Sequence, residues 1–102
     1  MIPELTERRA ELERICREHR VRKLELFGSA ATSHYRPGES DLDFLLEFED
    51  MPTRDYADAY FGFHEALERL FGRPVDLIAA NSVKNPYFLE SIAQTRALLY
   101  AS

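Results

Sequence analysis

Residues 22–27 read RKLELF and residues 41–48 read DLDFLLEF, and both stretches alternate in the way that is typical of β-strands. The pair Gly28-Ser29 ends the first strand. In the second strand Leu45 adds an apolar residue to the face opposite the main apolar row, which predicts that both faces are partly covered. The main row consists of Leu42, Phe44, Leu46 and Phe48. The two stretches therefore predict neighbouring strands of a buried sheet, joined by a polar connection.

The rest of the chain is predicted to supply three helices and at least one more strand. The expected elements are a helix over residues 3–19, a helix over residues 54–71 with Thr53 as N-cap and Gly72 at its end, a strand over residues 75–79, and a last helix starting at Asn85-Pro86 or nearby Ser82. Residues 98–100 fit either the end of that helix or an edge strand. Strands alternating with helices predict an α/β (α+β) fold, a small mixed sheet with flanking helices.

Length and charge narrow the class of protein. With 102 residues we expect one domain over residues 1–102. The net charge of −5 argues against a protein that coats nucleic acid, because binding phosphates needs clustered cations. The single cysteine, Cys16, cannot form an internal disulfide and is predicted to be buried. With neither an apolar run of about 20 residues nor an apolar signal core, we expect a soluble cytoplasmic protein without membrane contact.

Three aspartates stand where strands rarely accept them. Asp41 and Asp43 are two apart on one strand, so their carboxylates point to the same side and repel each other. Asp76 interrupts the apolar stretch VDLI at residues 75–78, where a charge is costly unless it is paired or binds a metal. If these strands are neighbours, the three carboxylates converge. Oxygen ligands favour Mg²⁺ or Mn²⁺, and three carboxylates can hold two such ions for nucleotidyl transfer.

Gly28 and Ser29 add a candidate phosphate site. Glycine lets the backbone approach a phosphate closely, and Ser29 can offer both its hydroxyl and its N–H. The simpler interpretations are a plain turn for Gly28-Ser29, a solvated strand end for Asp41 and Asp43, and for Asp76 an ion pair with a neighbour such as Arg73.

These residues resemble the nucleotidyltransferase fold of the DNA polymerase β superfamily. The signature of that family is Gly-Ser, a gap of about ten residues, Asp-x-Asp and a third Asp on a later strand, and it is matched by Gly28, Ser29, Asp41, Asp43 and Asp76. The resemblance extends over residues 73–78 and 85–100, and the short chain is similar to the minimal nucleotidyltransferases (MNT). The chain departs from the signature of the family in two ways. The gap has eleven residues, and Thr32-Ser33 stands where many relatives carry Arg-Gly.

The resemblance implies a function and a partner. It implies that Asp41, Asp43 and Asp76 bind two Mg²⁺ ions and catalyse the reaction, and that Gly28 and Ser29 bind ATP. It implies an antitoxin that transfers AMP to a tyrosine of a HEPN toxin, and the negative net charge suits a basic partner. Two alternatives stay open, an antitoxin that acts by binding alone and a nucleotidyltransferase acting on a small molecule. The missing Arg-Gly favours the binding alternative.

Other groups of residues have plainer interpretations. The basic cluster at the end of the first helix is predicted to complement the helix dipole rather than to steer a nucleotide or RNA. The three histidines are predicted to be structural. The apolar residues of the helix over 54–71 cover half its circumference, which fits either deep burial or a partner-binding face that Tyr87 and Phe88 extend. The basic cluster consists of Arg17, Arg20, Arg22 and Lys23. The three histidines are His19, His34 and His64. The apolar face of the helix over 54–71 consists of Tyr56, Ala57, Tyr60, Phe61, Phe63, His64, Leu67, Leu70 and Phe71.

Overall fold

A computed structural model describes residues 3–28, 42–80 and 85–102 of the chain. Its elements are α1 (Pro3–Glu7), α2 (Arg9–Glu18), β1 (Val21–Phe27), β2 (Leu42–Phe48), α3 (Thr53–Phe71), β3 (Val75–Ala79), α4 (Pro86–Thr95) and β4 (Ala97–Ala101). The four strands form one sheet in the order β3-β2-β1-β4. β1 pairs antiparallel with β2 and β4, whereas β2 and β3 are parallel. The expected small mixed sheet with flanking helices is therefore confirmed.

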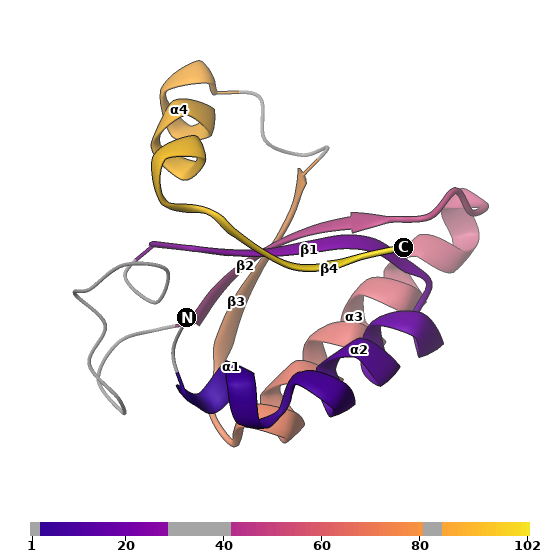
Figure 1. Ribbon diagram of the computed structural model, residues 1–102. Coiled ribbons are helices and arrows are strands. Elements are labelled where there is room, and N and C mark those ends of the chain that lie inside the picture. Colours follow the sequence, from indigo (N-terminus) through magenta and orange to yellow (C-terminus); the bar gives the residue numbers. More distant parts are fainter. Residues whose placement is uncertain (1–2, 29–41, 81–84) are drawn as a thin grey trace.

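The sheet separates two unequal layers (Figure 1). α2 and α3 pack side by side on one face and enclose the main core, whereas α4 lies on the other side of the sheet. A smaller apolar cluster on that second face holds Phe27 and Leu45, and the ring of Phe88 on α4 meets Phe27 edge-on at 6.2 Å between centroids. Leu45 is 6% exposed, so the prediction that both faces of its strand are covered is confirmed.

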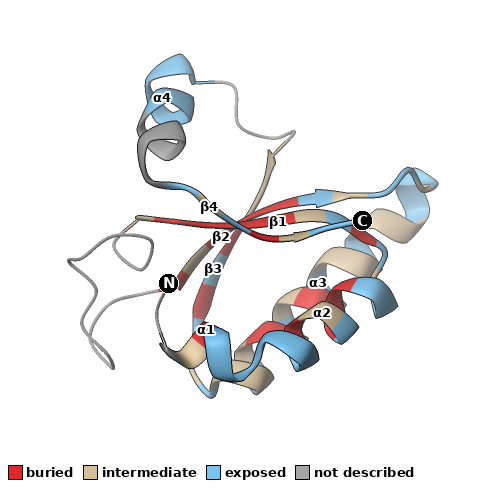
Figure 2. Ribbon diagram, in the orientation of Figure 1, coloured by how far each residue is buried: buried red, intermediate tan, exposed pale blue. Residues whose placement is uncertain are grey.

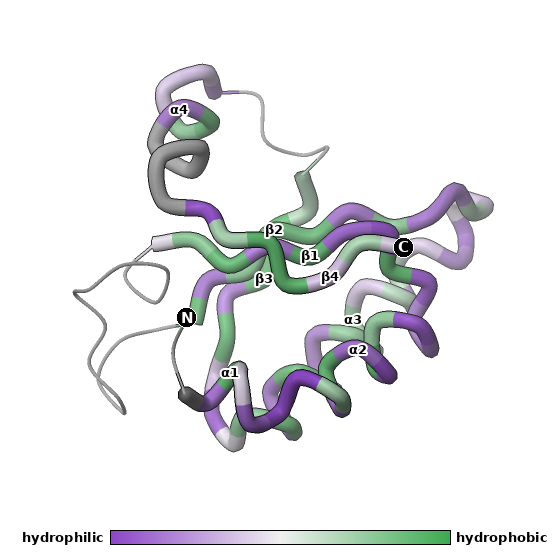
Figure 3. Tube along the Cα trace, viewed as in Figure 1, coloured by the Kyte–Doolittle hydropathy of each residue, from purple (hydrophilic) through white to green (hydrophobic). Residues whose placement is uncertain are grey.

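Burial follows the pattern of apolar residues. The buried positions run along the strands and along the inner sides of α2 and α3 (Figure 2), and the same surfaces are the hydrophobic ones (Figure 3). Cys16 lies in this core, as predicted, and burial raises the pKa of its thiol to about 12. None of the helices in the described ranges is long and apolar enough to cross a membrane.

The N-terminal helix differs from the prediction of one helix over residues 3–19. Arg8, with φ −108° and ψ 17°, separates α1 from α2. The apolar spacing does not reveal this break, because Leu5 before it and Leu12 after it are both fully buried. The next strand starts at Val21, one residue earlier than predicted.

The start of α3 was predicted wrongly by one residue. Thr53 is the first helical residue, and Pro52 is the N-cap with an extended backbone and no capping side chain. The C-terminal end was predicted correctly, because Gly72 adopts the left-handed conformation at φ +67°. Strand β3 coincides with the predicted residues 75–79.

The C-terminal elements resolve two alternatives. α4 begins at Pro86, which suits a first helical position, and the Asn85 side chain accepts a hydrogen bond from the Tyr87 N–H at 2.9 Å. Ser82 lies outside the described residues. The tail forms the edge strand β4, which pairs with β1 and buries Leu99.

Candidate functional site

Asp43 on β2 and Asp76 on β3 lie opposite each other in the parallel register. The two strands run side by side in the sheet (Figure 1). Each stands between two buried apolar residues of its own strand, so both carboxylates project from the face of the sheet opposite α2 and α3. Neighbouring strands are about 4.8 Å apart. Two carboxylates at that spacing repel each other unless a cation or water lies between them, and a hard cation such as Mg²⁺ suits oxygen ligands.

Gly28 lies against one member of this pair, Asp43. It follows β1 directly with φ +73°, and its neighbour Phe27 is opposite Asp43 in the antiparallel register. A Cβ on Gly28 would come within 2.5 Å of Asp43 Oδ2 and 3.5 Å of Asp43 Cγ. Only glycine therefore leaves room for the Asp43 carboxylate at this turn.

The structure thus brings together three of the five residues expected at the site. Gly28, Asp43 and Asp76 meet at one end of the sheet, whereas Ser29 and Asp41 lie outside the described residues. Within residues 3–28, 42–80 and 85–102, no three His, Cys, Asp or Glu side chains form a metal-binding group. The two carboxylates that are described supply the hard oxygen donors that Mg²⁺ requires.

Arg73, the neighbour named in the plain interpretation of Asp76, forms an ion pair with α1. Its Nη2 lies 3.6 Å from Glu4 Oε2 on α1, so this arginine connects the turn between α3 and β3 to the N-terminal helix. Asp76 itself is exposed on the edge strand.

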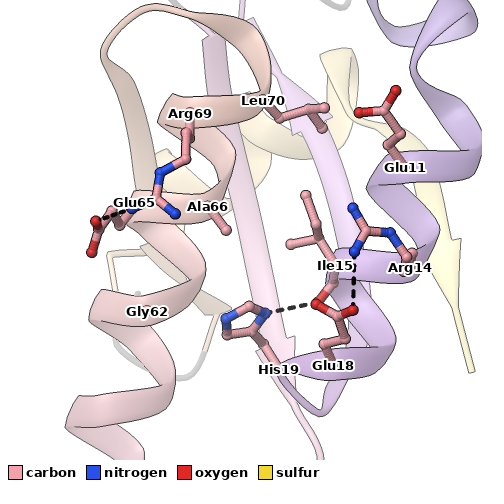
Figure 4. A pocket seen from close by; sticks show the side chains of 10 residues that line it. All are labelled: Glu11, Arg14, Ile15, Glu18, His19, Gly62, Glu65, Ala66, Arg69 and Leu70. Atoms are coloured by element: carbon pink, nitrogen blue, oxygen red, sulfur yellow. Dashed lines mark hydrogen bonds and ion pairs between the residues drawn. The ribbon is translucent and has the colours of Figure 1, made fainter.

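A hollow of about 410 Å³ between α2 and α3 lies apart from the carboxylates (Figure 4). Four of the charged side chains on its walls form ion pairs, Arg14 with Glu18 at 3.1 Å and Arg69 with Glu65. His19 at its rim donates from Nδ1 to the Ile15 carbonyl at 2.9 Å, which confirms a structural role for this histidine. We assign no chemistry to this hollow.

The wide apolar face of α3 turns out to be divided. Phe63 and Leu67 are fully buried, and Tyr60, Leu70 and Phe71 pack against the core, which confirms the burial interpretation for most of it. Phe61, however, is 67% exposed, beside an apolar hollow of about 450 Å³ between α3 and β3. Tyr87 and Phe88 do not extend this surface, because α4 lies on the other side of the sheet (Figure 1).

The basic cluster is used within the fold. Arg17 lies in the last turn of α2, as the dipole interpretation predicts. Arg22 pairs with Glu47 at 3.6 Å and with Asp50 at 3.9 Å. His34 lies outside the described residues.

Glu25 was missed by the sequence analysis. It occupies the central strand β1 and is only 7% exposed, between Lys23 Nζ and Arg96 Nε, each 3.4 Å from one of its carboxylate oxygens. The alternation of β1 indicates only which face Glu25 is on. Its burial depends on β4 pairing alongside, and the order of strands is not contained in a local pattern.

Two carboxylates that face each other across neighbouring strands, with a glycine turn packed against one of them, are compatible with an enzyme of phosphoryl or nucleotidyl transfer. The chain matches the nucleotidyltransferase domain family over residues 9–99, and it belongs to that family. It is 33% identical over 93 residues to a Methanocaldococcus jannaschii protein named "Putative protein adenylyltransferase MJ1379", a match that covers 83% of this chain and 91% of the relative.

Two solved structures have the same fold. A "putative minimal nucleotidyltransferase" superposes with a TM-score of 0.73 at 28% identity, over 91% of this chain and 90% of the other. One chain of a solved structure described as a tri-AMPylated Shewanella oneidensis HEPN toxin in complex with MNT antitoxin matches with a TM-score of 0.65 at 15% identity, over 95% of this chain and 72% of the other. The second likeness concerns the fold alone.

Proposed function

We propose that this chain is an antitoxin-type nucleotidyltransferase that transfers AMP from ATP to a tyrosine hydroxyl of a HEPN-type partner. The observation that carries the proposal is the register of Asp43 opposite Asp76, with Gly28 against Asp43. The relative named as a protein adenylyltransferase supports a protein acceptor. The solved complex of an AMPylated HEPN toxin with an MNT antitoxin suggests the kind of partner.

In this proposal each site residue has its own part. Asp41, Asp43 and Asp76 hold two Mg²⁺ ions, and Gly28 and Ser29 hold the triphosphate. Mg²⁺, when bound, supplies positive charge beside the phosphates. The tyrosine oxygen forms a bond to the α-phosphorus of ATP, the bond to pyrophosphate breaks, and Asp76 accepts the tyrosine proton. Because Asp76 lies exposed on the edge strand, a partner protein can reach it.

The proposal includes the setting of the reaction. Residues 1–102 act as one minimal nucleotidyltransferase domain in a hetero-oligomer with the toxin. The place of action is the cytoplasm, where ATP is available and a lone cysteine such as Cys16 stays reduced.

Transfer is tested by incubating the chain and a candidate HEPN partner with α-labelled ATP and Mg²⁺. We expect label on the partner, and loss of label with Asp41→Ala and with Asp43→Ala. Asp50→Ala is the matched control, because Asp50 is fully exposed away from the site. Label that persists in Asp43→Ala rules out the proposed site.

One observation favours a second candidate, an antitoxin that acts by binding alone. Phe61 is 67% exposed beside the apolar hollow, as a protein-binding residue would be. The same variants separate the two functions. If Asp43→Ala still binds the toxin and abolishes its toxicity without labelling it, binding alone is sufficient.

A further inference from the structure

The outer edge of β3 is held by side chains of α3 rather than by another strand. β3 is an edge strand, and such strands present backbone groups that need partners. Three α3 residues at four-residue spacing, Tyr60, His64 and Glu68, reach this edge. The Tyr60 hydroxyl donates to the Leu77 carbonyl, His64 Nε2 donates to the Val75 carbonyl at 2.9 Å, and the Val75 N–H donates to Glu68 Oε2 at 3.1 Å.

These bonds bracket Asp76. They hold the backbone of the residue before it and of the residue after it, while the other edge of β3 pairs with β2 in the register that places Asp76 opposite Asp43. We propose that Tyr60, His64 and Glu68 are positioning residues that fix β3 so that the Asp76 carboxylate stays opposite Asp43. This inference rests on the proposed function, because Asp76, the residue that these three side chains hold in place, is the one proposed to accept the tyrosine proton.

Contacts among Tyr60, His64 and Glu68 support their hydrogen bonds to β3. The rings of Tyr60 and His64 stack with an interplanar angle of 3°. The Tyr60 hydroxyl is protonated at neutral pH, as tyrosines ordinarily are, and can donate. Burial raises its pKa, and the neighbouring Tyr56 and Asp76 raise it further. His64 Nε2 also lies 3.7 Å from Glu68 Oε2, so the second and third members are close neighbours at this edge.

The experiment compares three variants of α3. Glu68→Leu removes the acceptor for the Val75 N–H, whereas Glu68→Gln keeps an acceptor oxygen of nearly the same reach. Glu65→Gln is the control, because Glu65 is exposed on the same helix and pairs only with Arg69 among the described residues. Glu68 is itself partly exposed, so all three variants are expected to fold.

Two readouts need no transfer reaction. Hydrogen exchange of the Val75 amide is expected to speed up about tenfold in Glu68→Leu, the loss expected for one hydrogen bond. Mn²⁺ affinity, measured with a non-hydrolysable ATP analogue, is expected to fall about tenfold in Glu68→Leu and to stay within twofold in Glu68→Gln and Glu65→Gln. Unchanged Mn²⁺ affinity in Glu68→Leu, or an equal loss in Glu68→Gln, overturns the positioning role.

The transfer assay then separates this inference from the proposed function. We expect kcat to fall roughly tenfold to a hundredfold in Glu68→Leu and in Tyr60→Phe. With Mg²⁺ at saturating concentration the KM for ATP should stay within twofold, because Gly28 and Asp43 lie on β1 and β2, which pair with each other. An unchanged kcat contradicts the inference. If the wild-type chain shows no transfer while the Mn²⁺ results hold, the proposed reaction fails and the positioning of Asp76 stands.

Discussion

The Cα of Gly28 lies against the carboxylate of Asp43, so closely that a Cβ would come within 2.5 Å of Oδ2. Gly28→Ala should therefore displace the Asp43 carboxylate and reduce AMP transfer by at least about tenfold, in addition to the roughly 1–2 kcal/mol cost of an alanine at φ +73°. Labelled ATP measures the transfer, and urea denaturation measures the free energy of unfolding.

Gly72→Ala is the matched control for this change. Gly72 has a similar φ of +67°, but nothing lies within 4 Å of the Cβ position. The two variants should lose similar stability, and only Gly28→Ala should lose transfer. Equal losses of transfer would show that backbone strain alone is responsible.

Mg²⁺ with ATP should raise the melting temperature of the wild-type chain. Without a cation, Asp43 and Asp76 repel each other, and a ligand that binds only the folded state adds about 2.7 kcal/mol at a hundred times its dissociation constant. Differential scanning fluorimetry should show the shift in wild type and Asp50→Asn, but not in Asp43→Asn. The absence of a shift in wild type would count against the cation site.

Cys16 should resist thiol reagents in the native state, because burial, followed by the charge of Glu13, raises its thiol pKa to about 12. The ordinary pKa of a cysteine thiol is 9.0, so above about pH 9 the unfolded chain loses a proton that the folded chain keeps. Cys16 therefore makes stability fall by up to about 1.4 kcal/mol per pH unit between about pH 9 and 12. Urea denaturation of wild type and Cys16→Ala over this range should show a shallower fall in the variant; parallel curves would contradict the shift.

Glu25→Gln should destabilise the fold by about 1–2 kcal/mol, because the buried carboxylate holds Lys23 and Arg96 together on the second face of the sheet. Glu47→Gln is the control, since Glu47 pairs with Arg22 in solvent and should change the free energy of unfolding by less than about 0.5 kcal/mol. Urea denaturation of both variants gives the comparison. If the two variants lose similar free energies of unfolding, burial does not strengthen the ion pairs of Glu25.

Much of the fold could be predicted from local patterns. The alternation around Leu24 and Phe44 and the glycine at position 72 identify strands and a helix end, because backbone geometry imposes a period of two on strands and a left-handed residue on many helix ends. The break at Arg8 could not be predicted, since the apolar spacing continues across it.

The amino-acid sequence was enough to single out Gly28, Asp43 and Asp76. A charged aspartate inside an apolar strand costs free energy unless it is paired or binds a metal, and a glycine at the end of a strand permits a tight turn. Three relationships became visible only in the folded structure: Asp43 lies opposite Asp76, Gly28 leaves room for the Asp43 carboxylate, and Glu68 accepts a hydrogen bond from the edge of β3. The physical reason is that strand order and register arise from hydrogen bonds between segments far apart in the chain, and no local period encodes them.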